Sequence, residues 1–258
     1  GVLYWLTIPA VSAPSATAIG PRQSGPIALT ADDSTLVNVN PEANTISVFD
    51  SSSSTLVKLG EVKVGRDPES VAVQPTVDRH GDDDDEDEDG QRDGALAYVA
   101  NSFDGTVSVV SLKNRKVKDV IKVGAEPSAV ALSPNGTRLY VANSSSNNLM
   151  VFDATKKKPR FITSVDLSAF GTAPRAIAVT NDGDTDDTDE TVFVALFFAQ
   201  LRPGKTALNE TEDDQREGRV VAISAATNSV LGPTTTLQPI SNTGFNANGR
   251  LSPGPNQV

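Results

Sequence analysis

The chain has 258 residues, no cysteine, only 5% aromatic residues and a formal net charge of −11 at pH 7. This length suits one compact domain, or part of a larger repeat domain, with a sizeable buried core. The absence of cysteine excludes disulfides, thiolate metal sites and a cysteine nucleophile, and the acidic balance without a basic stripe argues against a nucleic-acid partner.

The negative charge is concentrated in two tracts. Residues 78–93 carry ten acidic and two basic side chains, and residues 182–190 carry six more acids. Without these tracts the chain is slightly positive. The total charge therefore describes two local segments and not the whole surface.

The leading segment, residues 1–19, begins GVLYWLTIPAVSAPSA. An apolar run that gives way to small residues resembles the end of a secretory signal peptide, although no basic segment precedes it, and an ordinary first strand fits equally well. Pro9 and Pro14 argue against a membrane-spanning helix, as does the shortness of the run, and no later stretch is long and apolar enough to span.

The rest of the chain is a repeat. Four similar units start at Pro26, Pro68, Pro127 and Pro174, which are 42, 59 and 47 residues apart, and the longest interval contains the acidic tract 78–93. A fixed period of this length is typical of propellers and solenoids.

Each unit has the pattern of four strands. In the third unit, alternating or small apolar residues occupy 128–133, 138–142, 148–152 and 161–167, and turn residues separate them; the first unit repeats this at 27–29, 35–39, 45–49 and 56–64. Strands at such regular spacing favour one propeller blade per unit. A β-sandwich would not repeat at a fixed period, and solenoid coils are usually shorter.

We therefore predict an all-β fold, a β-propeller of four-stranded antiparallel blades over residues 20–235. About four blades are present, and because propellers usually have more, we expect part of a larger ring. Residues 236–258 are then a Gly/Pro/Asn-rich tail or a truncated next blade. Uncovered blade faces and edges would make the chain prone to aggregate.

The second strand of the middle units carries the motif YVAN at 98–101 and 140–143. Together with PSAVALSPNG at 127–136, VFD at 151–153 and IKVG at 121–124, this motif resembles the YVTN-type β-propeller repeat. Blade one departs with LVNVN at 36–40, and blade four with VFVAL at 192–196. The recurrence predicts that Tyr98 and Tyr140 pack between blades and that Asn101 and Asn143 form turns at the strand ends.

Two acidic insertions join first and second strands, at 78–93 and 181–190, and should project from the same face of the ring. Carboxylate oxygens at alternate positions suit a hard cation such as calcium, and the candidate ligands are Asp182, Asp184, Asp186, Asp189 and Glu190. The spacing departs from the helix–loop–helix calcium pattern, and a solvated acidic loop is the alternative reading of both insertions.

Charged residues precede or begin several first strands, where a propeller has the rim of its central channel. These candidate binding residues are Arg66, Asp67, Glu69, Glu126 and Arg175; solvated rim charges are the alternative. A loop at 199–218, on the face opposite the acidic insertions, is a candidate partner contact or a disordered insertion. No catalytic residue is marked, because the single histidine, His80, lies beside the acidic tract.

The YVTN-type family includes surface-layer and secreted bacterial or archaeal proteins, and lactonase-like propellers are related in fold. The resemblance implies an extracytoplasmic binding or scaffold module at the cell envelope, extracellular or periplasmic, with a protein or envelope partner and calcium as the candidate ion. The alternative is a lactonase-like or metal-dependent hydrolase on the same scaffold.

Overall fold

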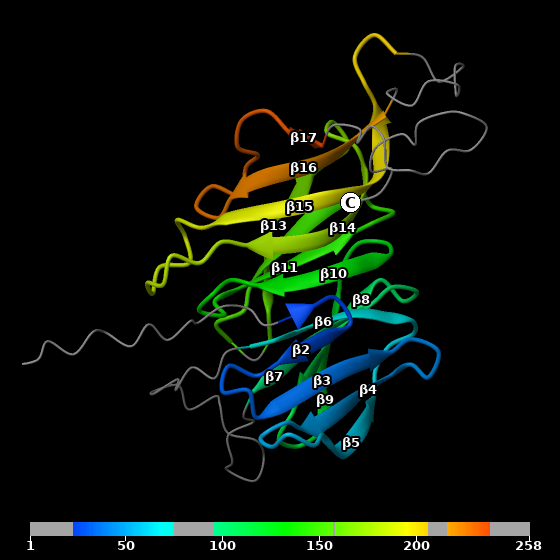
Figure 1. The fold of residues 1–258 in the computed structure, drawn as a ribbon, viewed down its shortest axis with the longest axis vertical. Helices are drawn as coiled ribbons and strands as arrows, with labels where there is room; N and C mark the ends of the chain where they lie inside the picture. The colour runs from blue at the N-terminus through cyan, green and yellow to red at the C-terminus, as the bar shows by residue number, and fades with distance from the viewer. Residues whose placement is uncertain (1–22, 75–94, 157, 206–215, 238–258) are drawn as a thin grey trace, which may run out of the picture.

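The computed structural model describes residues 23–74, 95–156, 158–205 and 216–237. Within these ranges the chain forms four antiparallel sheets and no helix, so no helix there could cross a membrane. Each sheet is one blade, and the blades follow one another in chain order (Figure 1). The predicted all-β propeller architecture is confirmed.

The strands of each blade pair in sequence order. Blade one contains β1 (Gln23–Ser24), β2 (Ile27–Leu29), β3 (Thr35–Asn40), β4 (Thr45–Asp50) and β5 (Val57–Lys63), and blade two contains β6 (Pro68–Val73), β7 (Leu96–Asn101), β8 (Thr106–Ser111) and β9 (Lys116–Lys122). Blade three contains β10 (Pro127–Leu132), β11 (Arg138–Asn143), β12 (Asn148–Asp153) and β13 (Arg160–Asp166), and blade four contains β14 (Thr172–Val179), β15 (Thr191–Leu201), β16 (Arg216–Ser224) and β17 (Thr235–Leu237).

The first strands of successive blades lie side by side, because β6 contacts β2 and β10, and β10 contacts β14 (Figure 1). Small residues allow this approach: Ala72 in β6 and Ala129 and Ala131 in β10 are buried. The ends of these strands therefore gather at the centre of the arc, where the predicted channel rim lies.

The core consists of three apolar layers between blades. Tyr98 of blade two packs in a buried cluster with Val141 of blade three, and Tyr140 of blade three packs in another with Val194 of blade four. Both tyrosine rings are essentially inaccessible, at 0% and 1% exposure, which confirms the predicted packing role. A buried aromatic side chain contributes about 2–3 kcal/mol of hydrophobic stabilisation.

The asparagines of YVAN pack closely against the linker before their blade, and one of them, Asn143, also hydrogen-bonds to it. The Asn143 Oδ1 atom accepts a hydrogen bond of 3.1 Å from the backbone N–H of Gly124. A Cβ atom at Gly124 would lie 2.7 Å from Asn143 Cγ, and one at Gly65 would lie 2.6 Å from Asn101 Cγ. The glycine at the end of each IKVG-like segment is thus required by the asparagine side chain of the following blade.

Among the described residues, no blade covers the second face of blade four. Phe193 pairs with Ala178 as Tyr140 pairs with Ala131, so Phe193 occupies the place of the tyrosine that faces the next blade. Phe193 is 38% exposed. The corresponding surface is buried in blades two and three.

Two expected boundaries differ from the structure. The loop predicted at 199–218 is shorter, because β15 runs to Leu201 and β16 begins at Arg216, with Gln200 paired to Glu217. Residues 206–215 of that loop lie outside the described residues, as do the segment 1–19, the acidic tract 78–93 with His80, and most of the tail 236–258, whose first two residues belong to β17.

Candidate functional site

A polar pocket lies where the loops before β6, β10 and β14 meet. Its volume is about 240 Å³, and its walls come from three blades. The lining residues are Asp67, Glu69, Ser102, Glu126, Ser128, Ser144 and Arg175. Four of the five predicted rim residues are therefore brought together around one cavity.

The backbone positions two of these acids by the same local conformation. Asp67 and Glu126 each precede the proline that begins a first strand, with φ angles of 55° and 52°. Their carbonyl oxygens accept hydrogen bonds of 2.8 Å from the N–H groups of Ser102 and Ser144 respectively. A left-handed conformation costs a residue other than glycine about 1–2 kcal/mol, and blade one has Gly25 at this position with φ 53°.

Glu69 and Arg175 face each other across the pocket. Their Oε2 and Nη2 atoms are 3.9 Å apart, and the Arg175 guanidinium also lies over the Phe197 ring at 4.8 Å. Burial raises the pKa of the Glu69 carboxyl; the Arg175 charge opposes this effect, and the Asp67 and Glu126 charges add to it. A carboxyl with a raised pKa in a cavity has the properties of a general base.

Arg66, the fifth predicted rim residue, is held elsewhere. Its backbone N–H and its Nε–H donate to the two oxygens of Asp104 over 2.7 Å each. Its guanidinium lies 4.0 Å from the centre of the Phe103 ring, which is 67% exposed. Arg66 is not among the residues that line the pocket.

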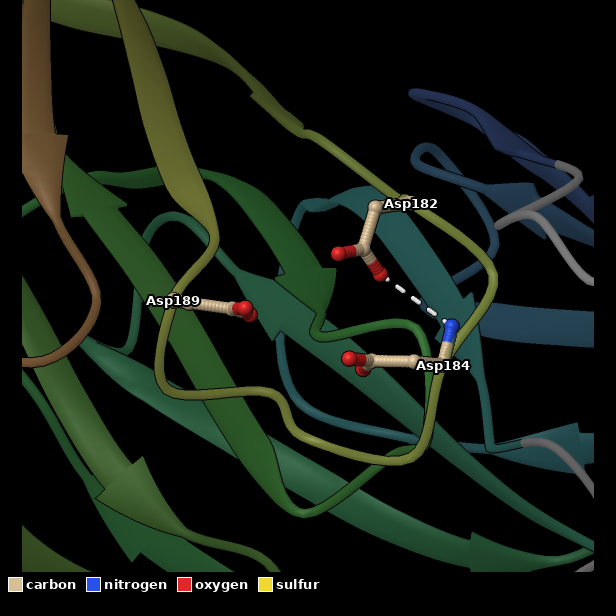
Figure 2. A group of neighbouring side chains, drawn as sticks. All are labelled: Asp182, Asp184 and Asp189. Atoms are coloured by element: carbon tan, nitrogen blue, oxygen red, sulfur yellow. Dashed lines mark hydrogen bonds between the residues drawn. The ribbon is translucent and has the colours of Figure 1, made fainter.

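The predicted metal ligands divide into two groups. Asp182, Asp184 and Asp189 are exposed, and each contributes a carboxylate oxygen to a group whose members lie within 4.8 Å of one another. Figure 2 shows the three side chains pointing towards the middle of the loop between β14 and β15, with the Asp184 N–H donating to Asp182 Oδ1 over 3.1 Å. Desolvation raises the pKa of Asp189, and the charges of Asp182 and Asp184 raise it further.

The other two predicted ligands satisfy hydrogen bonds within their own loop. Asp186 accepts bonds from the N–H and the hydroxyl of Thr188, at 2.8 and 2.6 Å. The buried Glu190 accepts bonds from the Thr180 hydroxyl and from the Asp182 N–H. Three of the five candidate ligands thus come together, and calcium binding stays a prediction.

Sequence reasoning missed the most connected acid of this loop. Asp187 is only 3% exposed and accepts bonds from Ser133 Oγ, from the backbone N–H and side-chain amide of Asn135, and from the N–H and hydroxyl of Thr137. It thereby fixes the Pro-Asn-Gly turn of blade three to blade four. The sequence places Asp187 in an acidic run, but nothing in the run marks it as the buried member.

A comparison with protein families agrees with the propeller architecture of the described residues. Residues 87–185 match a family model described as "Lactonase, 7-bladed beta-propeller". The fold is a β-propeller. No curated protein matches the chain.

Solved structures extend the comparison along the chain. Kuenenia stuttgartiensis hydrazine synthase is 25% identical with a TM-score of 0.60, over 93% of this chain and 54% of that one. Two putative 6-phosphogluconolactonases, from Bacteroides uniformis and Bacteroides fragilis, are 13% and 16% identical with TM-scores of 0.53 and 0.54, over 82% of this chain and 54% of theirs. The chain thus spans about half the length of these structures, and the latter two show likeness of fold alone.

Proposed function

We propose that this chain carries part of a lactonase-like propeller whose polar pocket hydrolyses a cyclic ester. The observation that carries the proposal is the Glu69–Arg175 pair in a cavity at the centre of the arc. The match of residues 87–185 to the lactonase propeller model supports the same reaction class.

The pocket contains the groups that ester hydrolysis needs. Glu69 takes a proton from a water molecule while the water oxygen forms a bond to the lactone carbonyl carbon. The Arg175 guanidinium stabilises the negative charge that develops on the carbonyl oxygen. The ring C–O bond then breaks, the ring oxygen receives the proton, and the product is an open hydroxy acid.

The acidic cluster of Figure 2 is not part of this pocket. Arg175 lies near the start of β14, whereas Asp182, Asp184 and Asp189 follow its end. At about 3.3 Å per residue, the extended strand separates the two places by roughly 20 Å. A metal held by that cluster would therefore act on stability and not on the proposed reaction.

The hydrolase is favoured over the binding or scaffold module expected at the cell envelope. The family match names a lactonase propeller, and no observation on the described residues indicates an envelope partner or an extracytoplasmic location. Those two expectations stay predictions.

Proton release from simple sugar lactones, followed in a pH-stat, tests the proposal. Glu69→Gln should lower kcat/KM at least about 100-fold, because general-base catalysis contributes 10²–10⁴. Glu61→Gln is the matched control, since Glu61 is on blade one and bonds to Thr45 and Lys58. A wild-type protein without lactone hydrolysis above background, or a Glu69→Gln variant with full activity, would refute the proposal.

A further inference from the structure

We infer that the pocket selects an uncharged, polyhydroxylated lactone and rejects its phosphorylated counterpart. This inference rests on the proposed function and specifies its substrate class. It differs from the substrate that the names of the two Bacteroides structures suggest for those proteins. The argument begins from the charges that line the cavity.

Three carboxylates face one guanidinium in the pocket. The carboxylates belong to Asp67, Glu69 and Glu126, and the guanidinium belongs to Arg175. The other lining residues are serines, and among these described lining residues there is no lysine or histidine. With all four groups ionised, the lining carries a net charge of −2.

The single cation of the lining, Arg175, lies beside a carboxylate and an aromatic ring. Its guanidinium lies 3.9 Å from the Glu69 carboxylate and 4.8 Å from the centre of the Phe197 ring. A phosphate beside Arg175 would therefore also lie beside the Glu69 carboxylate. Because burial and two neighbouring carboxylates already disfavour the charge of Glu69, an incoming dianion would meet repulsion from all three acids.

The same lining suits hydroxyl groups. Carboxylate oxygens accept strong hydrogen bonds from hydroxyl donors, and Ser102 and Ser144 are among the other lining residues. A volume of about 240 Å³ is below the range of roughly 300–1,000 Å³ typical of drug-sized ligands. The pocket therefore fits one small polar ring with several hydroxyls.

The charge pattern also favours release of the product. Hydrolysis of a neutral lactone creates a carboxylate, which the acids of the pocket repel. The substrate is uncharged and escapes this repulsion. The open hydroxy acid should therefore bind more weakly than the ring from which it forms.

Calorimetric titration of the protein with two stable probes tests the inference. The probes are the δ-lactam of gluconic acid, which is neutral, and the 6-phosphate of the same lactam. We expect the neutral lactam to bind about tenfold more tightly or better, because charges a few ångströms apart in a pocket interact strongly enough to change affinity by that factor. Gluconate should also bind more weakly than the lactam.

A pair of double variants isolates the effect of the pocket charges. Asp67→Asn/Glu126→Gln should reduce the preference for the neutral lactam to a few-fold, and asparagine tolerates the positive φ of position 67. Asp50→Asn/Glu61→Gln removes two charges of blade one, away from the pocket, and should leave the preference unchanged. Melting temperatures of both variants check that each is folded.

Several results would overturn the inference: equal or tighter binding of the phosphate, no binding of the lactam, or an unchanged preference in the pocket variant. The proposed function fails separately. Lactam preference without any lactone hydrolysis would refute the hydrolase and leave the ligand class standing. Hydrolysis of phosphorylated and neutral lactones with equal kcat/KM would refute the preference for a neutral ligand and leave the hydrolase standing.

Discussion

Replacement of Asp187 by asparagine should destabilise the junction between blades three and four. One carboxylate oxygen accepts bonds from the Asn135 N–H and side-chain amide, and the other accepts bonds from the N–H and hydroxyl of Thr137 and from Ser133 Oγ. An asparagine amide can replace only one of these oxygens. In either orientation, its NH₂ group points at a backbone N–H, of Asn135 or of Thr137.

The size of the effect follows from these contacts. A hydrogen bond to a charged group contributes about 1.5–3 kcal/mol, and a buried donor left without an acceptor costs about 1–3 kcal/mol. Loss of the charge, together with one opposed pair of donors, should lower the free energy of unfolding by about 3 kcal/mol. For a chain of this size, such a loss lowers the melting temperature by roughly 6–12 °C.

Thermal melts of Asp187→Asn and Asp186→Asn give the comparison. Asp186 undergoes the same chemical change in the same loop, but its side chain is exposed and bonds only to Thr188. Its variant should stay within about 0.5 kcal/mol of the wild type. Equal melting temperatures for the two variants would refute the assigned role of Asp187.

The destabilisation should also depend on pH. Burial pushes the pKa of Asp187 upwards, but the bonds from Thr137, Ser133 and the backbone outweigh it and hold the pKa below the ordinary value of 3.8. The folded state then binds fewer protons than the unfolded state, so this stabilisation is complete above about pH 4 and disappears as the pH falls through the lowered pKa. Denaturant titrations at several pH values should show a smaller difference between wild type and Asp187→Asn in acid than at neutral pH. A difference that stays constant down to pH 2 would contradict the linkage.

Three further predictions concern other parts of the fold. Phe193→Ser should make the 258-residue chain more monodisperse in light scattering, because it removes an exposed ring from the face of blade four that has no neighbouring blade among the described residues. A wild type that is already monodisperse would argue against this. Asp189→Asn should raise the melting temperature measured in chelator, since it relieves like-charge repulsion. Added calcium should raise the melting temperature of the wild type but not that of the variant. A wild type whose melting temperature does not change with calcium would contradict the predicted site. Gly124→Ala should cost about 1–3 kcal/mol by overpacking, because the added Cβ atom would lie 2.7 Å from Cγ and 2.8 Å from Cβ of Asn143. In chemical denaturation, adding Asn143→Gly, which removes both atoms, should recover part of the loss. A purely additive double variant would disprove the steric conflict.

The repeat allowed the fold to be predicted closely. The third unit was expected at 128–133, 138–142, 148–152 and 161–167, and the four strands of blade three lie within one residue of these limits. Local pattern is sufficient here, because alternation and turn residues recur in every blade. The short β1 was not expected, since two residues carry no periodic signal.

The site could be predicted only in part. Loops that lead into first strands must meet at the centre of any propeller, so the pocket residues Asp67, Glu69, Glu126 and Arg175 follow from topology. Arg66 does not reach the pocket, because it forms an ion pair with Asp104, which is 38 residues away in the sequence. Only the tertiary structure shows that these two residues meet.

One repeated position explains how a uniform scaffold acquires an asymmetric pocket. In each of the four described blades, the residue before the first-strand proline has a φ angle between 52° and 58°; these residues are Gly25, Asp67, Glu126 and Ala173. In blades two and three, the carbonyl of that residue accepts a bond from the loop after the second strand, so the backbone holds this conformation through main-chain contacts. The side chain can then vary without loss of the fold. Acids at this position in blades two and three alone, opposite Arg175 of blade four, give the pocket its negative wall.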